Sequence, residues 1–382
     1  MAGKLKAMAG KLPVVFLTGP RQSGKSTLLR QFFTDRFGYV SLEDKDTRDF
    51  ALHDPRGFLN SFGDRVIIDE AQRAPDLFSY IQTRVDKKGK PGMYILSGSQ
   101  NFLMMRNISQ SLAGRAGILS LLPFSLSELA AAGRSPVTAN EWLFYGSYPR
   151  LISSKINPRD FFPGYIATYV ERDIRQETRI HELDKFRRFL GIIASYTGSP
   201  VNLTKLGSEV SIDARTADSW LSILEESYII FRVAPYYSNI GKRYTKTPKL
   251  YFYDTGLLCA LLGLTRPKEL NFHAMKGHIF EAAVISEIMK KYHNAGKQPR
   301  LYYWRDSDNK DREIDLVETG PYGLELTEIK SSQTANRDYT RNLLNFSLNA
   351  KEKIKSRRVI YDNNDRPVFS GVRYASWRTF GE

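Results

Sequence analysis

The stretch Gly-Pro-Arg-Gln-Ser-Gly-Lys-Ser-Thr at residues 19–27 constrains the fold more than any other part of the chain. It follows a short apolar run and has the G-x-x-x-x-G-K-[ST] spacing of a phosphate-binding loop between a strand and a helix. Gly19 and Gly24 let the backbone N–H groups turn toward a phosphate, and the following helix adds its positive dipole end. Lys25 would reach the β- and γ-phosphates, and the Ser26 hydroxyl would bind Mg²⁺. ATP and Mg²⁺ are therefore the expected cofactors. The rest of the expected nucleotide-binding loop is Pro20, Arg21, Gln22, Ser23 and Thr27.

A second nucleotide-binding element follows about 45 residues later, where the apolar run 66–68 ends in two acids, Asp69 and Glu70. Acids at the carboxyl end of a strand, beside the phosphate loop, can serve both the metal and the attacking water. We assign the Mg²⁺ shell to Asp69 and the orientation or deprotonation of water to Glu70. Residues 1–150 are thus expected to form an α/β P-loop NTPase domain with a parallel sheet.

The length and charge of the chain set wider limits. A chain of 382 residues exceeds what one core usually serves, so two or three domains are expected. No apolar run is long enough to cross a bilayer, and residues 1–11 lack the features of a signal peptide. The lone Cys259 excludes an internal disulfide and fits a reducing cytoplasm. The net charge of +15 favours a polyanionic partner, most simply nucleic acid, over a membrane surface.

Four motifs occur in order: the phosphate loop, Asp-Glu-Ala-Gln at 69–72, Ser-Gly-Ser-Gln at 97–100 and Leu-Ala-Gly-Arg at 112–115. This series resembles a widespread prokaryotic AAA-type ATPase family whose C-terminal half is a domain of unknown function, and the resemblance covers nearly the whole chain. In such ATPases the third motif senses the γ-phosphate, which implies that role for Ser97 or Ser99 without choosing between them. Arg115 is the candidate arginine for the γ-phosphate, acting in cis or from a neighbouring subunit. Action in trans would imply a homo-oligomeric ring.

The middle of the chain, residues 151–268, is expected to hold a helical linker and a winged-helix DNA-binding domain. Helices at 184–194, 202–210 and 213–227, with short links, precede strands at 228–234 and 249–253. Cations and tyrosines between these strands suit a nucleic-acid surface. The alternative is a winged helix used for protein contacts. The expected DNA-binding residues are Arg215, Thr216 and Ser219 on the third helix and Lys242, Arg243 and Lys246 on the wing.

The C-terminal part, residues 269–382, resembles the PD-(D/E)xK nuclease core. A helix bearing Glu281 precedes a strand with Asp315 and a strand with Glu328-Ile329-Lys330. Asp315 and Glu328, with Glu281 nearby, could hold Mg²⁺, and Lys330 could position or activate a water molecule. Domains of this fold also occur as binding modules that do not cleave.

Three functions follow from these features. The first is an ATPase that binds DNA. Branched or broken DNA is its expected substrate, because winged-helix and nuclease-like modules recur in recombination and repair enzymes. The second is an ATP-gated, metal-dependent DNA nuclease. The third is a nucleotide-dependent switch or scaffold for a protein partner.

Overall fold

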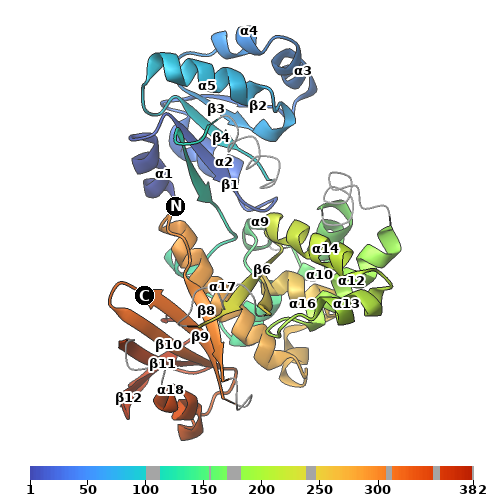
Figure 1. The fold of residues 1–382 in the computed structure, drawn as a ribbon, viewed down its shortest axis with the longest axis vertical. Coiled ribbons are helices and arrows are strands. Elements are labelled where there is room, and N and C mark those ends of the chain that lie inside the picture. The colour runs from blue at the N-terminus through green and yellow to red at the C-terminus, as the bar shows by residue number, and fades with distance from the viewer. Residues whose placement is uncertain are drawn as a thin grey trace. The chain divides into compact units, whose positions relative to one another are not determined.

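The computed structural model describes residues 1–99, 112–154, 156–169, 182–237, 247–306, 312–346 and 353–380. The chain forms two compact units (Figure 1). The first contains residues 1–123 with 226–228 and 292–298, and the second contains 124–225, 229–291 and 299–382. Among the described helices, none is both long and apolar enough to cross a membrane.

Within its described residues, the first unit is built on a parallel sheet of five strands in the order β2-β3-β4-β1-β5. The strands are β1 (Val14–Thr18), β2 (Gly38–Ser41), β3 (Val66–Asp69), β4 (Tyr94–Ser97) and β5 (Ala116–Ser120). Its helices are α1 (Ala2–Ala9), α2 (Lys25–Phe33), α3 (Lys45–His53), α4 (Pro55–Asn60) and α5 (Leu77–Lys88), with a 3₁₀ turn η1 (Ala71–Arg73).

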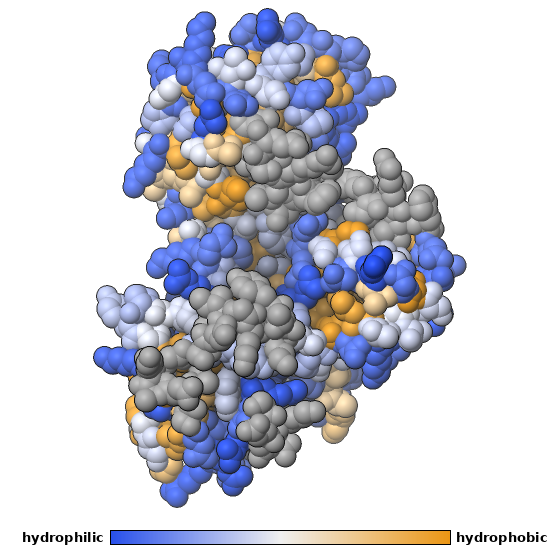
Figure 2. Space-filling view, viewed as in Figure 1, coloured by the Kyte–Doolittle hydropathy of each residue, from blue (hydrophilic) through white to orange (hydrophobic). Residues whose placement is uncertain are grey.

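The central strand β1 is buried along its whole length. Val14 and Phe16 belong to one hydrophobic cluster, while Val15 and Leu17 belong to another. Alternate side chains of a strand point to opposite faces, so the two clusters mark the two covered faces of a parallel sheet. The expected α/β sheet of a P-loop NTPase is confirmed. Figure 2 shows that most of the visible surface of this unit is hydrophilic.

The carboxyl ends of the five strands meet at one edge of the sheet. Ser41 pairs with Asp69, the residue before Thr18 pairs with Ser97, and Thr18 pairs with Ser120. Ligands of open α/β sheets bind at this edge, where the loops leave the strands.

The second unit begins with helices and ends with a large mixed sheet. Its helices are α7 (Leu126–Ala131), α8 (Ala139–Tyr145), α9 (Pro149–Ser154), α10 (Pro158–Tyr165), α12 (Leu183–Ser195), α13 (Leu203–Val210), α14 (Ala214–Glu226), α16 (Thr255–Leu261), α17 (Lys276–Asn294) and α18 (Arg341–Asn345). Two 3₁₀ turns, η3 (Pro267–Asn271) and η4 (Arg337–Thr340), accompany them.

Eight strands of the described chain form one sheet in the order β12-β13-β11-β10-β9-β8-β6-β7. They are β6 (Ile230–Pro235), β7 (Lys249–Phe252), β8 (Leu301–Arg305), β9 (Glu313–Gly320), β10 (Gly323–Lys330), β11 (Ile354–Tyr361), β12 (Arg366–Phe369) and β13 (Val372–Ser376). The ladders β8–β9 and β9–β10 are antiparallel, whereas β10, β11 and β13 run parallel to one another.

This division differs from the three domains expected at 1–150, 151–268 and 269–382. The first unit gives way to the second at residue 123 rather than 150, and no boundary between units separates 268 from 269. The reason is strand pairing, because β6 runs parallel to β8, with Ala234 opposite Tyr302 and Pro235 opposite Tyr303. The two strands expected in a separate winged helix therefore continue the sheet of the C-terminal strands.

Helix α17 lies in the core of the second unit, and every residue from 279 to 290 is buried. Its ionic groups are paired internally: Lys290 Nζ donates to Glu287 Oε1 at 2.6 Å, to Ser147 Oγ at 2.9 Å and to the Phe124 carbonyl at 3.0 Å. The other Glu287 oxygen accepts from the Leu126 backbone N–H at 2.7 Å. Because each buried charge has partners, the helix can carry charged residues through a core.

Candidate functional site

The loop after β1 has the backbone geometry that its glycines predict. Gly19 has φ +143° and Gly24 has φ +94°, values that side chains disfavour. A Cβ placed on Gly19 would lie 2.1 Å from the Leu121 carbonyl oxygen, so only glycine fits there. Helix α2 begins at Lys25, directly after this turn, and its first N–H groups are therefore free to face an anion.

The Lys25 ammonium is buried inside this loop. Its Nζ donates to the carbonyl oxygens of Gly19 at 2.9 Å and Pro20 at 2.8 Å. Burial lowers the pKa of Lys25 to about 8, although the nearby Glu70 and Asp69 carboxyls act in the opposite direction. The group is still mostly charged at neutral pH and is poised to move to a stronger anionic partner.

Asp69, the last residue of β3, is the centre of a hydrogen-bond network. It accepts from Ser97 Oγ at 2.5 Å and from the Tyr39 hydroxyl at 2.7 Å. Burial would raise the pKa of Asp69, but hydrogen bonds from Ser26, Ser97 and Tyr39 outweigh it and hold the pKa below the usual value. The structure thus brings the two expected Mg²⁺ ligands, Ser26 and Asp69, together as a hydroxyl and an ionised carboxylate, the donors that Mg²⁺ prefers.

Glu70 follows at the strand end in an unusual conformation. Its φ of +54° is left-handed, which for a residue with a side chain is uncommon and costs energy. Burial raises the pKa of Glu70, and Asp69 raises it further, while Lys25 opposes both. Gln72 Nε2 donates to Glu70 Oε2 at 2.5 Å. A carboxylate with a raised pKa beside the phosphate loop is a stronger base than an exposed glutamate.

The two candidate serines differ in their surroundings. Ser97 ends β4 and binds Asp69, whereas the buried Ser99 Oγ has no hydrogen-bond partner among the residues that the structure describes. Ser23 Oγ, inside the phosphate loop, is also buried without a partner there. Hydroxyls left open in this way, together with the N–H groups at the start of helix α2, fit a bound nucleotide.

Beside Asp69 the first unit has an open cavity of about 620 Å³. It is lined by Ser26, Thr27, Arg30, Gln31, Tyr39, Ser41, Glu43 and Asp69. The sequence patterns missed Tyr39, which lies on β2 and whose ring faces the Arg30 guanidinium at 4.4 Å. The hydrogen bond from the Tyr39 hydroxyl to Asp69 could not be predicted from the sequence. Tyr39 lies thirty positions before Asp69, in a strand without a recognisable motif.

Arg115 lies away from this edge, which corrects the cis assignment. Its carbonyl accepts from the Val14 N–H, so it sits where β1 and β5 begin rather than where they end. Five strand residues at about 3.3 Å each separate the two edges, more than an arginine side chain spans. Its guanidinium instead binds Asp86 through Nε at 2.5 Å and Nη2 at 3.0 Å. Action on a neighbouring subunit stays a prediction.

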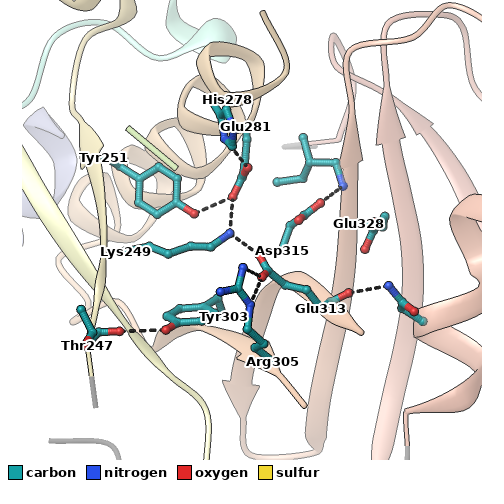
Figure 3. Close-up of polar contacts among 12 residues, drawn as sticks. Thr247, Lys249, Tyr251, His278, Glu281, Tyr303, Arg305, Glu313, Asp315 and Glu328 are labelled. Carbon is teal, nitrogen blue, oxygen red and sulfur yellow. Dashed lines mark hydrogen bonds and ion pairs between the residues drawn. The ribbon is translucent and has the colours of Figure 1, made fainter. Parts of the chain in front are cut away.

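A second group of ionisable residues lies in the second unit (Figure 3). Lys330 Nζ is 2.7 Å from Glu328 Oε1 and 3.9 Å from Asp315 Oδ2, and the Ile329 N–H donates to Asp315 at 2.7 Å. The structure thus brings Asp315, Glu328 and Lys330 together, as expected. Burial raises the pKa of Asp315 to about 6 and that of Glu328 to about 8, and in each case a neighbouring carboxyl adds to the effect.

Glu281, the third expected metal ligand, is already bound to other groups. Its Oε1 accepts from Lys249 Nζ at 3.1 Å and from the Tyr251 hydroxyl at 2.6 Å. Burial alone would raise its pKa, but Lys249, His278 and Tyr251 lower it to about 2. Among the described residues, no group of three acidic, histidine or cysteine side chains is arranged to hold a metal ion. The expected set of Glu281, Asp315 and Glu328 does not form such a group in the described chain, and ammonium groups lie among its carboxylates.

The expected DNA-binding residues are only partly within the described chain. Arg215 and Ser219 are exposed on α14, and Thr216 Oγ1 donates to Asp213, the residue before the helix, at 2.7 Å. Lys242, Arg243 and Lys246 lie outside the described residues. Lys249, which follows this stretch as the first residue of β7, is buried.

Three family models match separate stretches of the chain. Residues 11–130 match an AAA domain, and residues 137–268 and 276–380 match two domains of unknown function, DUF8612 and DUF4143. The uncharacterized proteins Rv2008c of Mycobacterium tuberculosis and Mb2031c of Mycobacterium bovis are each 31% identical to this chain over 329 residues. The aligned part is 85% of this chain and 72% of each relative.

Solved structures also match this chain. The Walker-type ATPase PABY2304 of Pyrococcus abyssi is 18% identical, with a TM-score of 0.44, over 68% of this chain and 94% of that one. A RuvB variant of Thermotoga maritima is 21% identical, with a TM-score of 0.31, over 60% of this chain and 88% of its own. From the AAA-domain match and the mycobacterial relatives, this chain belongs to a prokaryotic family of AAA-type ATPases that includes Rv2008c and Mb2031c.

Proposed function

We propose that this AAA-type ATPase hydrolyses ATP at the β1–β3 edge and couples hydrolysis to binding of branched or broken DNA by its second unit. The ATPase part is supported by the Asp69 network, in which Ser26, Ser97 and Tyr39 hold one ionised carboxylate beside the buried Lys25. The DNA part is supported by the positive charge of the chain and by two surfaces of the second unit.

At the ATPase site each residue has a role that its environment allows. Lys25 would leave its two carbonyl partners to neutralise phosphate charge, and Ser26 and Asp69 would hold Mg²⁺. Bound Mg²⁺ would supply further neutralisation of the phosphates. Glu70, with its raised pKa, would take a proton from the attacking water. Ser97 would keep Asp69 oriented, and Ser99 would be free to bind phosphate oxygen.

The first DNA surface is the helix pair α13–α14. Ser211, with φ +62°, makes the turn between the helices, and Asp213 accepts from the N–H groups of Arg215 and Thr216 at the start of α14. Tight helix pairs of this kind place the start of the second helix against a DNA groove. The α13–α14 pair supports a DNA-binding role, although β6 and β7 pair within the large C-terminal sheet and do not form a separate wing.

The second surface, a cavity in the second unit, gives the strongest support for DNA binding. The second unit has a cavity of about 900 Å³ whose lining includes Arg266, Lys268, Lys276 and Arg378. The lining also contains Glu141 and Asp362, and Lys276 and Arg378 act on the pKa of Asp362. No ion pair among the described residues involves Arg266 or Lys268, so their charges are available to phosphates. Phe272, next to this lining, is 94% exposed. Cations that line a cavity can contact phosphates, and an exposed aromatic ring beside it can stack on an unpaired base.

The test is the ATPase rate of the full chain alone and with duplex, forked and four-way DNA. We expect DNA to stimulate hydrolysis and Lys25→Ala to abolish it. The double variant Arg266→Glu/Lys268→Glu should keep the rate without DNA but lose DNA binding and stimulation. A matched control, Lys11→Glu/Lys45→Glu, changes net charge equally at exposed positions of the first unit and should retain both.

The outcomes separate the candidate functions. Stimulation that survives Asp315→Ala supports the ATPase with DNA as its effector, whereas metal-dependent cutting abolished by Asp315→Ala or Lys330→Ala would favour the ATP-gated nuclease. Phosphate contacts are strongest at low salt. Absence of DNA binding even there would refute both and leave a nucleotide-dependent switch for a protein partner.

A further inference from the structure

Lys249 is the least expected member of the ionisable group in Figure 3. Its side chain is only 3% exposed, although it is the first residue of strand β7. The ammonium forms ion pairs with Glu281 and Glu313 and lies 5.4 Å from the centre of the Tyr303 ring. Figure 3 shows it between the Glu281 carboxylate from helix α17 and the carboxylates from strand β9. One cation thus bridges two elements that would otherwise bring like charges together.

The burial of this cation is compensated on every side. Burial alone would lower the pKa of Lys249, but Glu281, Asp315 and Glu313 raise it above the usual value. Tyr251 shares Glu281 with it, and Arg305 Nε donates to Glu313 Oε2 at 2.5 Å. A buried charge held this way is a fixed part of the structure.

The carboxylates that a divalent cation would need are occupied. Mg²⁺ requires about six oxygen ligands near 2.1 Å. Oε1 of Glu281 accepts two hydrogen bonds, Oδ2 of Asp315 accepts the Ile329 N–H, and Oε1 of Glu328 faces Lys330. Among the carboxylate oxygens of this cluster in the described chain, Oε2 of Glu328 is buried without a partner. Mg²⁺ can be held by one or two carboxylates together with water, so the obstacle is the ammonium groups that lie between the carboxylates.

The net charge of the cluster is also close to zero without a bound metal ion. The four carboxyls belong to Glu281, Glu313, Asp315 and Glu328. Three cations face them, Lys249, Lys330 and Arg305. The described residues are therefore within one charge of balance, and a divalent cation would create an excess of positive charge in a buried site.

We propose that the Lys249 ammonium stands where a divalent cation would bind, so that the nuclease-like acids of this domain form a closed ionic core that does not cleave DNA. Among the described residues, ATP hydrolysis at the first unit is then the chemistry that remains, and the C-terminal acids have a structural role. This inference does not depend on DNA binding and stands or falls separately from it.

The experiment measures Mn²⁺ binding to the nucleotide-free full chain by electron paramagnetic resonance, in which bound Mn²⁺ loses the signal of the free ion. The wild type and Asp315→Asn should bind Mn²⁺ equally at millimolar concentration. Lys249→Met should gain about one equivalent of Mn²⁺ that disappears in Lys249→Met/Asp315→Asn. Lys355→Met, which removes an exposed lysine from strand β11 of the same sheet, is the matched control and should gain none.

Thermal unfolding gives a second readout. Lys249→Met should melt at a lower temperature than the wild type, because Glu281 loses its partner, and Mn²⁺ should recover part of the loss in that variant alone. Asp315-dependent Mn²⁺ binding or DNA cleavage by the wild type would overturn the proposal. So would a folded Lys249→Met that gains no Mn²⁺ site. If Lys249→Met fails to fold, Lys249→Gln replaces it, and the wild-type comparison with Asp315→Asn still decides.

Discussion

The substitution Lys25→Met tests how the phosphate loop balances stability against function. Lys25 is 6% exposed, and its pKa is lowered from 10.5 to about 8. At 1.36 kcal/mol per pKa unit, the folded loop disfavours the charged form by about 3 kcal/mol relative to water. Most substitutions of buried residues destabilise a protein. Here we expect the nucleotide-free variant to be as stable as the wild type or up to about 3 kcal/mol more stable, while ATP hydrolysis is lost.

The same pKa predicts how ATP affinity depends on pH. Phosphate binding needs the charged form of Lys25, whose fraction falls from about nine-tenths at pH 7 to about one-tenth at pH 9 for a pKa near 8. ATP affinity should therefore fall about tenfold over this range. The free energy of unfolding should instead increase with pH. Between pH 8 and 10.5 the Lys25 ammonium keeps its proton in the unfolded chain but has lost it in the folded chain. The stability of the wild type relative to Lys25→Met should therefore rise over this range.

Two assays check this reasoning on the full chain. Binding of a fluorescent ATP analogue at pH 7, 8 and 9 is compared between the wild type and Lys25→Arg, whose guanidinium stays charged throughout and should give a flat profile. Urea denaturation without nucleotide compares the wild type with Lys25→Met. The same pH dependence in Lys25→Arg, or a loss of more than about 2 kcal/mol in Lys25→Met, would refute the argument.

Four further outcomes are expected. Ser97→Ala removes a hydrogen bond to the carboxylate at the end of β3 and should lower kcat about tenfold or more, since bonds to charged groups contribute about 1.5–3 kcal/mol; an unchanged kcat in steady-state assays would contradict its role. Arg115→Ala breaks only an exposed ion pair, so denaturation should show a loss below about 1 kcal/mol, and single-turnover hydrolysis by dilute protein should be unaffected. Glu287→Ala leaves the Lys290 ammonium buried and unpaired, and urea titration should show a loss of about 3–5 kcal/mol, whereas a loss below about 1 kcal/mol would show that the site relaxes. The raised pKa of Glu328, about 8, means that the folded chain holds an extra proton above pH 4.5, so the stability of the wild type relative to Glu328→Gln should fall between pH 4.5 and 8.

The nucleotide site was the part of the molecule that the sequence predicted best. Its backbone turn, its lysine and its two acids belong to short motifs whose spacing is itself the geometric requirement, so reading them needs no knowledge of distant contacts. The parallel sheet followed because apolar runs that end in small or acidic residues alternate with helical patterns. These predictions depend on local sequence and on the rule that strand ends meet at one edge.

The predictions that failed depended on contacts between residues far apart in the chain. Arg115 follows a motif in the expected order, but the motif does not say at which end of β5 the arginine lies. The partners of Glu281 come from β7, about thirty residues earlier, and no local pattern places Lys249 beside that acid. A lysine at the head of the apolar stretch Leu250-Tyr251-Phe252 was the available signal of burial. A single sequence could not name the acid that compensates it.

The parallel pairing of β6 with β8 has a consequence for how this protein can be dissected. A fragment cut at residue 269 would lose β6 and β7, so the backbone of β8 would become an open strand edge, a template for association between copies. The same cut would remove Lys249 and leave Glu281 without its counter-charge. An expression fragment of the C-terminal sheet must therefore begin before Ile230, and proteolysis near residue 268 should release two pieces that stay associated until they are denatured.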